Sequence, residues 1–501
     1  MIAPSNPPAN AIESSLALLS QRIAMAGFVL YAAFAPHSIA GAEIALAIVG
    51  VGWLGRAIAT RKTGIRHTKL DLPIWLFFIW TIASSLLSEE PQISIAKLQS
   101  VCVLFLFYLT QAVVTRRTAT LLVCVMVLSG VTGTIYSVYD LLRGRGVVVD
   151  SISSDSPLQP GTIPGDAVWR IGGKRVYSTA AIDELIRATP SGTKLRLSII
   201  SRGEHVERPG FVVTDQLKRR ASPSGITGSV STHRFRASGW TRHYETYSEV
   251  LQIIAQLALG LALANLKNHG ANLRFKLATA ATIVLALGIA LTAMRTVLVA
   301  FVLGACVMTI RAARGSARLA VSAALILVLA FGAFVVWQTR AAGALSLQDP
   351  SASLRATVAK VGAARILIHP VFGHGMDAMH LHWNEWGFPG SDMLDLHSTP
   401  LQLAFDRGLP ALIFWLLIMA TFWLITTRAE YFFRDSGDTN RHGLLLGATG
   451  AIAGFFLSSL VNYNLGDGEV ALVFWWLMGI VVVLAHDDAD DRPANASQAV
   501  K

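Results

Sequence analysis

One histidine and three arginines have the side chains needed to move a proton and to hold an anionic group. His397 stands just ahead of an apolar run in "DLHSTPLQLAFDRGLPALIFW" (394–414). A histidine accepts a proton near neutral pH, so His397 is a candidate general base. Arg236, Arg295 and Arg355 stay charged, and their planar forks bind phosphate through paired hydrogen bonds. These residue types suit displacement of a sugar from a lipid diphosphate, where cations offset the leaving charge and a base activates a hydroxyl.

Each residue taken alone also has a simpler interpretation. A single histidine at a membrane edge is more often a hydrated surface residue, and Arg295 in the turn "LTAMRTVLVAF" can extend to lipid headgroups. The chemical interpretation therefore requires that all four residues lie on one side of a membrane.

The composition predicts an all-α polytopic membrane protein. Of 501 residues, 53% are hydrophobic and 15% are charged, whereas soluble domains carry about a quarter charged residues. Apolar runs long enough to span a bilayer recur about twelve times. We place them at 17–35, 41–55, 71–88, 96–114, 118–140, 244–265, 275–293, 295–311, 317–337, 408–427, 444–462 and 468–485.

Lysine and arginine in alternate short loops predict a cytoplasmic N-terminus, because positive charge resists translocation. This topology places the four candidate residues on the outer side. The net charge of +11 is then largely an orientation signal and does not call for a nucleic-acid partner. All three cysteines fall inside predicted spans, which predicts neither disulfides nor a thiolate metal site.

Two outer segments interrupt the predicted helices and divide the chain. Residues 146–214 read as a small soluble domain, 215–243 as a basic linker and 338–407 as a loop that holds His397. The membrane parts are then 1–140, 244–337 and 408–485, followed by a cytoplasmic tail at 486–501. At the start of the sixth span, Glu249, Gln252 and Gln256 share one helix face, which we expect to face a cavity.

Histidines and aspartates also crowd into the segment between His369 and His397. Their spacing fits no recognised ligand pattern and the HExxH motif is absent, so we predict no metal site. Upstream, Leu354, Val358, Val361 and Ile368 lie on one side of an amphipathic helix that could rest on the membrane surface and that Pro370 would stop.

The segment 146–214 resembles the bacterial PDZ domain. The resemblance lies in "VVVDSISSDSPLQPGTIPGDAVWRIGGKRV", followed by a helix and "GTKLRLSIISRG". It implies a groove between the strand near 147–152 and the helix near 179–188, where an extended peptide of an envelope protein would add a strand. A spacer with an empty groove is the alternative.

Outside this insert, the chain resembles the O-antigen ligase and polymerase superfamily of membrane glycosyltransferases. The family signature is a histidine followed by Ser, Asn or Gln, nine residues, Gly, two residues and a small or aromatic residue. His397, Ser398, Gly408 and Ala411 match it. The family's outer-helix arginine before His-Pro and Gly-x-Gly fits Arg355 and "HPVFGHG". Its Thr-x-x-Arg turn fits Arg295, and "RASG" fits from Arg236.

The resemblance implies a GT-C-like bundle of about twelve helices in the bacterial inner membrane, with the insert and the catalytic loop in the periplasm. It implies a metal-independent, inverting transfer without a cofactor. His397 would be the base, and Arg236, Arg295 and Arg355 would bind the diphosphate. The implied partners are membrane lipids, an undecaprenyl diphosphate-linked glycan donor and an acceptor, with lipid A core favoured. A glycan-chain acceptor would mean a polymerase, and a protein acceptor an oligosaccharyltransferase. A transporter and a membrane PDZ scaffold are the alternatives that are not enzymes.

Overall fold

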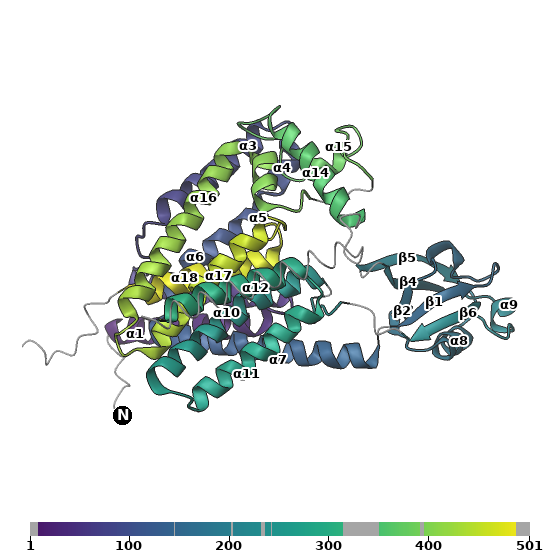
Figure 1. Cartoon of the computed structure of the whole chain (residues 1–501), viewed down its shortest axis with the longest axis horizontal. Coiled ribbons are helices and arrows are strands. Elements are labelled where there is room, and N and C mark those ends of the chain that lie inside the picture. Colours follow the sequence, from purple (N-terminus) through teal and green to yellow (C-terminus); the bar gives the residue numbers. More distant parts are fainter. Residues whose placement is uncertain are drawn as a thin grey trace, which may run out of the picture. The chain divides into compact units, whose positions relative to one another are not determined.

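The computed structural model describes residues 9–486 except 145, 202–203, 232–235, 242, 314–349 and 391–394. The described chain separates into two compact units. One contains residues 1–131, 248–289 and 294–501, and the other contains 132–247 and 290–293. The first unit is helical, and the second is built around an antiparallel sheet (Figure 1).

Nine helices within the described ranges are long and apolar enough to cross a membrane, as the composition predicted. The chain is therefore a mostly helical, multi-pass membrane protein. The nine are α1 (Ala9–Phe34), α2 (Ile39–Thr60), α7 (Arg116–Arg143), α10 (Tyr244–His269), α11 (Leu273–Leu291), α12 (Arg295–Ala312), α16 (Thr399–Phe433), α17 (Thr439–Ser459) and α18 (Gly468–Ala485).

Of the other three predicted spans, two form shorter helices and one cannot be compared. The run at 71–88 forms the shorter apolar helix α3 (Asp71–Leu87). The run at 96–114 forms the shorter apolar helical stretch Leu98–Val113. It consists of α5 (Leu98–Val101), the 3-10 turn η1 (Cys102–Phe105) and α6 (Leu106–Val113), and it follows α4 (Pro91–Ala96). The run at 317–337 lies outside the described residues, so the total of about twelve is not confirmed.

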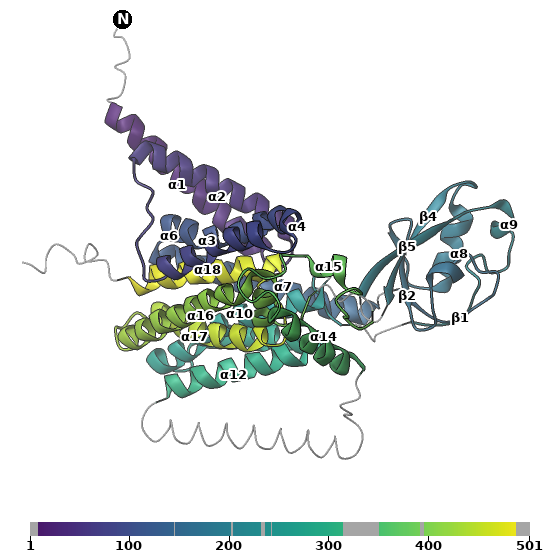
Figure 2. The same ribbon diagram turned by 90° about the horizontal axis from the view of Figure 1, so that it is seen from above.

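The polar face of α10 is buried between helices, which corrects the expectation that it lines a cavity. Glu249, Gln252 and Gln256 are at most 4% exposed. Glycines of neighbouring helices make room for them: a Cβ on Gly454 would lie 2.0 Å from the amide of Gln252. Gln256 donates from Nε2 to the carbonyl of Phe301 in α12 at 2.7 Å. These polar groups therefore join α10 to α12 and α17, which run side by side (Figure 2).

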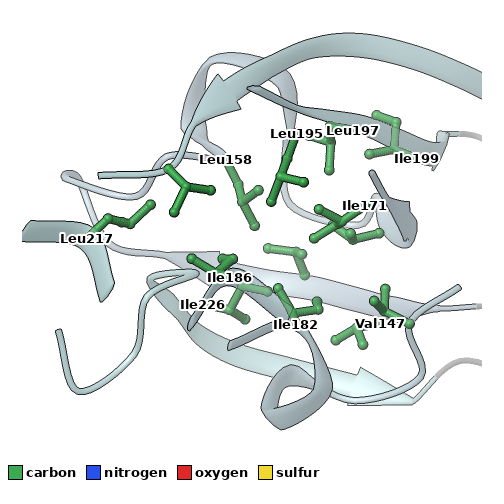
Figure 3. Close-up of a cluster of buried hydrophobic side chains, with 14 residues drawn as sticks. Val147, Leu158, Ile171, Ile182, Ile186, Leu195, Leu197, Ile199, Leu217 and Ile226 are labelled. Carbon is green, nitrogen blue, oxygen red and sulfur yellow. The ribbon is translucent and has the colours of Figure 1, made fainter. Parts of the chain in front are cut away.

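The second unit contains a six-stranded sheet. Its main path runs β5 (Glu204–Val212), β4 (Lys194–Ser201), β2 (Ala167–Ile171), β1 (Val147–Ile152) and β6 (Ile226–Ser231), and β3 (Lys174–Arg175) pairs with β2. The amphipathic helix α8 (Thr179–Ala188) adds Ile182 and Ile186 to a core of fourteen valine, leucine and isoleucine side chains (Figure 3). This core shows why apolar residues alternate along β1 and β4.

The segment expected to be a linker belongs in part to this unit. Its residues form α9 (Asp215–Lys218) and β6, and both Leu217 and Ile226 enter the aliphatic core. β6 pairs antiparallel with β1 from Val147–Ser231 to Ile152–Ile226. The edge of β1 that we expected a peptide to occupy is therefore already paired with the chain's own strand. An unpaired edge exposes backbone groups, and "ITGSVS" satisfies them here.

Candidate active site

His397 occupies a turn immediately before α16. Its φ of 49° lies in the left-handed region, which is costly for a residue other than glycine. The backbone N–H of His397 donates to Oδ1 of Asp395 at 2.6 Å, and the ring Nδ1 lies 3.4 Å from the same oxygen. Asp395 thus orients both the backbone and the imidazole. The histidine side chain remains 15% exposed, so it is accessible from one side.

Gln402 ties this turn to the first part of α16. Its Oε1 accepts from the backbone N–H of Leu396 at 2.7 Å, and its Nε2 donates to Oδ1 of Asp406 at 2.9 Å. Both ends of one buried amide are therefore used. The turn that holds His397 is coupled through Gln402 to a buried carboxyl group one helical turn further on.

Gly408 interrupts α16 with φ 80° and ψ 170°, a conformation open mainly to glycine. The kink leaves carbonyl groups of the helix available to other segments. The backbone N–H of His374 donates to the carbonyl of Phe405 at 2.8 Å, and the backbone N–H of Gly375 donates to the carbonyl of Asp406 at 3.0 Å. A Cβ on Gly408 would also collide with the carbonyl of Val371. The glycines of "HPVFGHG" and of the His397 signature thus allow these two segments to dock.

Asn462 links the start of α12 to the start of α16. Its carbonyl accepts from the backbone N–H of Thr399 at 3.1 Å, and its Nδ2 lies 3.5 Å from Oγ1 of Thr296. Thr296 directly follows Arg295, and Thr399 comes two residues after His397. The structure therefore brings the chain at Arg295 near the chain at His397. Arg295 is exposed, and none of the described residues forms a hydrogen bond or an ion pair with it.

Arg355 lies on α14 (Pro350–Ile366), which packs on protein and corrects the expectation of a membrane-surface helix. Val358 and Ile366 share a hydrophobic cluster with Leu396 and Phe405. A Cβ on Gly362 would approach the side chain of Leu396 to 2.7 Å. The helix that carries Arg355 therefore packs against the residue next to His397.

Arg236 belongs to the second compact unit. Its guanidinium lies 4.4 Å from the ring centre of Tyr244, within cation–π range. The contacts that join Arg295, Arg355 and His397 all lie within the helical unit, and Arg236 is not part of them.

One cavity of the helical unit begins beside the His397 turn. Its volume is about 520 Å³, within the range of about 300–1,000 Å³ typical of small-molecule sites. Neither His397 nor any of the three predicted arginines lines it. Its polar wall includes Lys97, Asp377, Gln402, Asp406, Arg407 and Tyr463. Lys97 and Asp377 form an ion pair at 2.9 Å. Because Gln402 also holds Leu396, the cavity adjoins the turn of the candidate base.

Arg407 is the most unusual residue of this cavity. It is 6% exposed, and its Nε has no hydrogen-bond partner among the described residues. The guanidinium lies 5.5 Å from the ring centre of Phe77. Buried polar groups are normally hydrogen-bonded, so the Nε of Arg407 is an exception beside this cavity.

The crowded histidines form ion pairs that the sequence did not reveal. His374 is fully buried and its Nδ1 lies 2.5 Å from Oε2 of Glu89, while its Nε2 lies 3.0 Å from the carbonyl of Arg365. His369 Nε2 lies 3.7 Å from the same carboxylate oxygen. These three ligand atoms lie within 4.8 Å of one another and could hold a metal ion. The predicted absence of metal therefore stays a prediction.

Comparison with known families found one similarity. Residues 280–416 match the family model described as O-antigen ligase. This part of the chain is therefore similar to O-antigen ligases, which supports ligase- or polymerase-like glycan transfer. The matched residues include Arg295, Arg355 and His397, but not Arg236 or the strands of the sheet unit. The comparison with curated proteins found no match.

Sequence reasoning missed Arg407, Asp406, Asn462 and Glu89. The sequence did contain a signal for Asp406 and Arg407. This pair interrupts an apolar run, and ionisable residues at such places usually serve a function. Glu89 gave no such signal, since it lies 285 residues from its partner His374.

Proposed function

We propose that the protein transfers a glycan from an undecaprenyl diphosphate donor to an acceptor hydroxyl at the periplasmic face of the inner membrane, with lipid A core as the favoured acceptor. The supporting observation is that one family match covers His397, Arg295 and Arg355, while Asn462 links the first two positions. These observations support a common role for the three residues in glycan transfer.

In this proposal His397 is the general base. With Nδ1 facing Asp395, Nε2 is the nitrogen that accepts a proton. The acceptor hydroxyl oxygen bonds to the anomeric carbon as the bond from that carbon to the diphosphate oxygen breaks, which inverts the configuration. The proton moves to His397, and the leaving diphosphate keeps the bonding electron pair. Arg295 and Arg355, with Arg236 as a third candidate, offset the charge that develops on it.

The cavity that contains Arg407 is assigned to the substrate glycan. Its wall combines cations, carboxyl groups, an amide and a phenol, which together offer donors and acceptors to sugar hydroxyls. Arg407 and Gln402 would hold a sugar close to His397. The reaction would then need no metal ion, because arginines supply the positive charge.

Deletion of the gene followed by analysis of envelope polysaccharides and glycoproteins tests this function. Loss of polymer on lipid A core, with lipid-linked polymer accumulating, is the expected ligase result. Products with single repeat units would identify a polymerase, and loss of protein-linked glycan an oligosaccharyltransferase. If all glycans are unchanged, the protein would instead be interpreted as a transporter or a scaffold.

A chelator tests metal independence in purified enzyme. Activity should survive, because none of the three arginines needs a metal ion to bind phosphate. Loss of activity that added divalent ion restores would assign Glu89, His369 and His374 as a metal site.

We further propose that the sheet unit recruits an envelope peptide. Strand addition at β1 requires β6 to leave, since β6 occupies that edge. Peptide binding should therefore increase when Ile226→Asp weakens the β6 contact with the core, and a screen that finds no peptide with either form would make the unit a spacer.

A further inference from the structure

Three side chains of the helical unit converge from two segments that are far apart in the sequence. Glu89 lies in the corner between α3 and α4, and His369 and His374 lie in the loop between α14 and α15 (Met379–His382). One carboxylate oxygen and one nitrogen of each imidazole lie within 4.8 Å of one another. Two imidazoles and a carboxylate form a ligand set that transition-metal sites use. Spacing within one segment could not reveal this set, because Glu89 lies 285 residues from His374.

The hydrogen bonds of His374 fix which nitrogen faces the carboxylate. His374 is fully buried, and its Nε2 lies 3.0 Å from the carbonyl of Arg365. A carbonyl only accepts, so Nε2 carries a hydrogen, and Nδ1 of a neutral imidazole then has a lone pair. This lone pair faces Oε2 of Glu89 at 2.5 Å, and an ionised carboxylate cannot donate either. A cation must therefore lie between the two atoms, either a proton or a metal ion. Histidine ligands of metal ions commonly donate their other N–H to a carbonyl in this way.

The position of His369 favours a metal ion over a proton. Its Nε2 lies 3.7 Å from the same oxygen of Glu89, which is too long for a hydrogen bond. The His369 ring has no hydrogen-bond partner among the described residues. Ligand atoms of one tetrahedral ion lie about 3.4 Å apart when each bond is about 2.1 Å long. The separations of 2.5 and 3.7 Å lie on either side of that value. Glu89 and His369 are 35% and 44% exposed, so small rotations of their side chains can reach it.

The backbone already holds the two segments together. The backbone N–H of Glu90, next to Glu89, donates to the carbonyl of His374 at 3.2 Å. Gly375 permits this close approach, since a Cβ there would lie 3.0 Å from Oγ of Ser88 and 3.2 Å from the carbonyl oxygen of Glu90. Its φ of 107° is also open mainly to glycine. Ligands that are positioned in advance lose less conformational freedom when the ion binds.

We propose that Glu89, His369 and His374 bind one divalent transition-metal ion, and that Zn²⁺ suits this ligand set best. Imidazole and carboxylate groups bind Zn²⁺, whereas Mg²⁺ and Ca²⁺ prefer oxygen ligands alone. The ion would join the α3–α4 corner to the loop that docks on the kink of α16 at Phe405. This role goes beyond the transfer reaction, in which the arginines would still offset the diphosphate charge. Transfer measured below the Tm of the ion-free protein should therefore not depend on the ion.

Metal binding by the full chain in lipid nanodiscs tests this proposal without any glycan donor, so its outcome is independent of the proposed function. Untagged protein is stripped with a chelator and then titrated with Zn²⁺ in competition with a chromophoric chelator. We expect one equivalent to bind, at least about a hundredfold more tightly than Mg²⁺. X-ray absorption should show nitrogen and oxygen ligands at about 2.0–2.2 Å from Zn²⁺ and no sulfur. Absence of stoichiometric binding, or equal binding of Mg²⁺, would overturn the proposal and make the three residues an ion-pair cluster only.

Two variants and a control locate the ion. His369→Asn and Glu89→Gln each remove one ligand and should weaken Zn²⁺ binding at least about tenfold, because even the loss of an outer partner of a ligand costs about 10–100-fold. His67→Asn removes an exposed histidine outside the cluster and should keep the wild-type affinity. Equal affinity in the wild type and both variants would place the ion elsewhere and overturn the proposal.

Thermal unfolding supplies a second measurement. Zn²⁺ at about a hundredfold excess over its Kd should raise the Tm of the wild type and of the His67 variant, because an ion that binds only the folded protein stabilises it. The rise should be smaller in both ligand variants, whose Tm without the ion shows whether they fold. An equal rise in all four proteins would contradict binding at this cluster.

Discussion

The two units use their buried interiors differently. The main core of the sheet unit is aliphatic, and two buried carboxyl groups there accept from nearby backbone: Asp166 from Ile163 at 3.0 Å and Asp183 from Ser224 at 2.7 Å. In the helical unit, Arg407 is buried beside a cavity, and its Nε has no hydrogen-bond partner among the described residues. A buried polar group without a partner costs stability. We therefore include Arg407 in the proposed glycan site.

Within the helical unit, the residues that hold two segments together differ from the residue proposed to react. Gly408 and the segment "HPVFGHG" hold each other through backbone hydrogen bonds, which use no reactive side chain. His397, by contrast, keeps part of its ring exposed beside the end of α14 and the Asn462 link. The backbone around the turn is held by hydrogen bonds and the imidazole is partly exposed, which suits a catalytic group.

The largest expected effect comes from the proposed base. His397→Ala should lower transfer by about 10²–10⁴-fold, because the proton acceptor is lost while no span is altered. Transfer from a lipid-linked donor by purified protein measures this. His67→Ala, at an exposed histidine, is the matched control for insertion and yield. Near wild-type product from the His397 variant would remove this residue from the mechanism.

Replacing the proposed diphosphate-binding arginines with lysine should lower transfer activity by a smaller factor, even though the positive charge is kept. Arg295→Lys and Arg355→Lys should each lower activity by about 10–100-fold, since an ammonium cannot form the paired hydrogen bonds of a guanidinium. Steady-state transfer rates measure this, and Lys360→Arg on the exposed side of α14 is the control. If both lysine variants work normally, diphosphate recognition reduces to general charge attraction.

Local patterns in the sequence predicted much of this architecture. Apolar runs located the membrane helices, because spanning length and hydropathy are properties of one segment. The resemblance of the segment 146–214 placed a strand near 147–152 and a helix near 179–188, which are β1 and α8. The run at 96–114 forms a shorter helical stretch than predicted, Leu98–Val113, because hydropathy does not register where a helix begins and ends.

Contacts between distant segments could not be predicted in this way. The pairing of β6 with β1, the Glu89–His374 pair and the Asn462 link each join residues far apart in the sequence. Periodicity describes a face of one element and does not identify what covers it. Of the site, the positions of His397, Arg295 and Arg355 came from motif spacing, and the cavity with Asp406 and Arg407 came only from the fold.

A stability test sharpens the contrast between core and surface in the sheet unit. Ile226→Ala removes a side chain that is 7% exposed within the aliphatic core, so it should destabilise this unit by about 2–5 kcal/mol. Val230→Ala on the same strand is the control, because Val230 is 56% exposed and should change stability by less than about 0.5 kcal/mol. Hydrogen exchange of β1 and β6 amides measures both. Equal effects would mean that β6 is only loosely attached.

The smallest effect concerns pH. Hydrogen bonds from the ring of His382 to the carboxylates of Glu385 and Glu90, both at 2.8 Å, raise the pKa of this histidine above its ordinary value of 6.5. A raised pKa in the folded state means stability that is fully present below pH 6.5 and is lost as pH rises through the folded pKa. Glu385 is 72% exposed, so solvent screening keeps the contribution below about 1 kcal/mol.

Thermal unfolding at about pH 5.5 and about pH 8 should show a lower Tm at the higher pH, and His382→Gln should reduce that difference. The exposed His67→Gln control should keep the wild-type difference, and identical differences in all three proteins would show that these ion pairs do not contribute to stability.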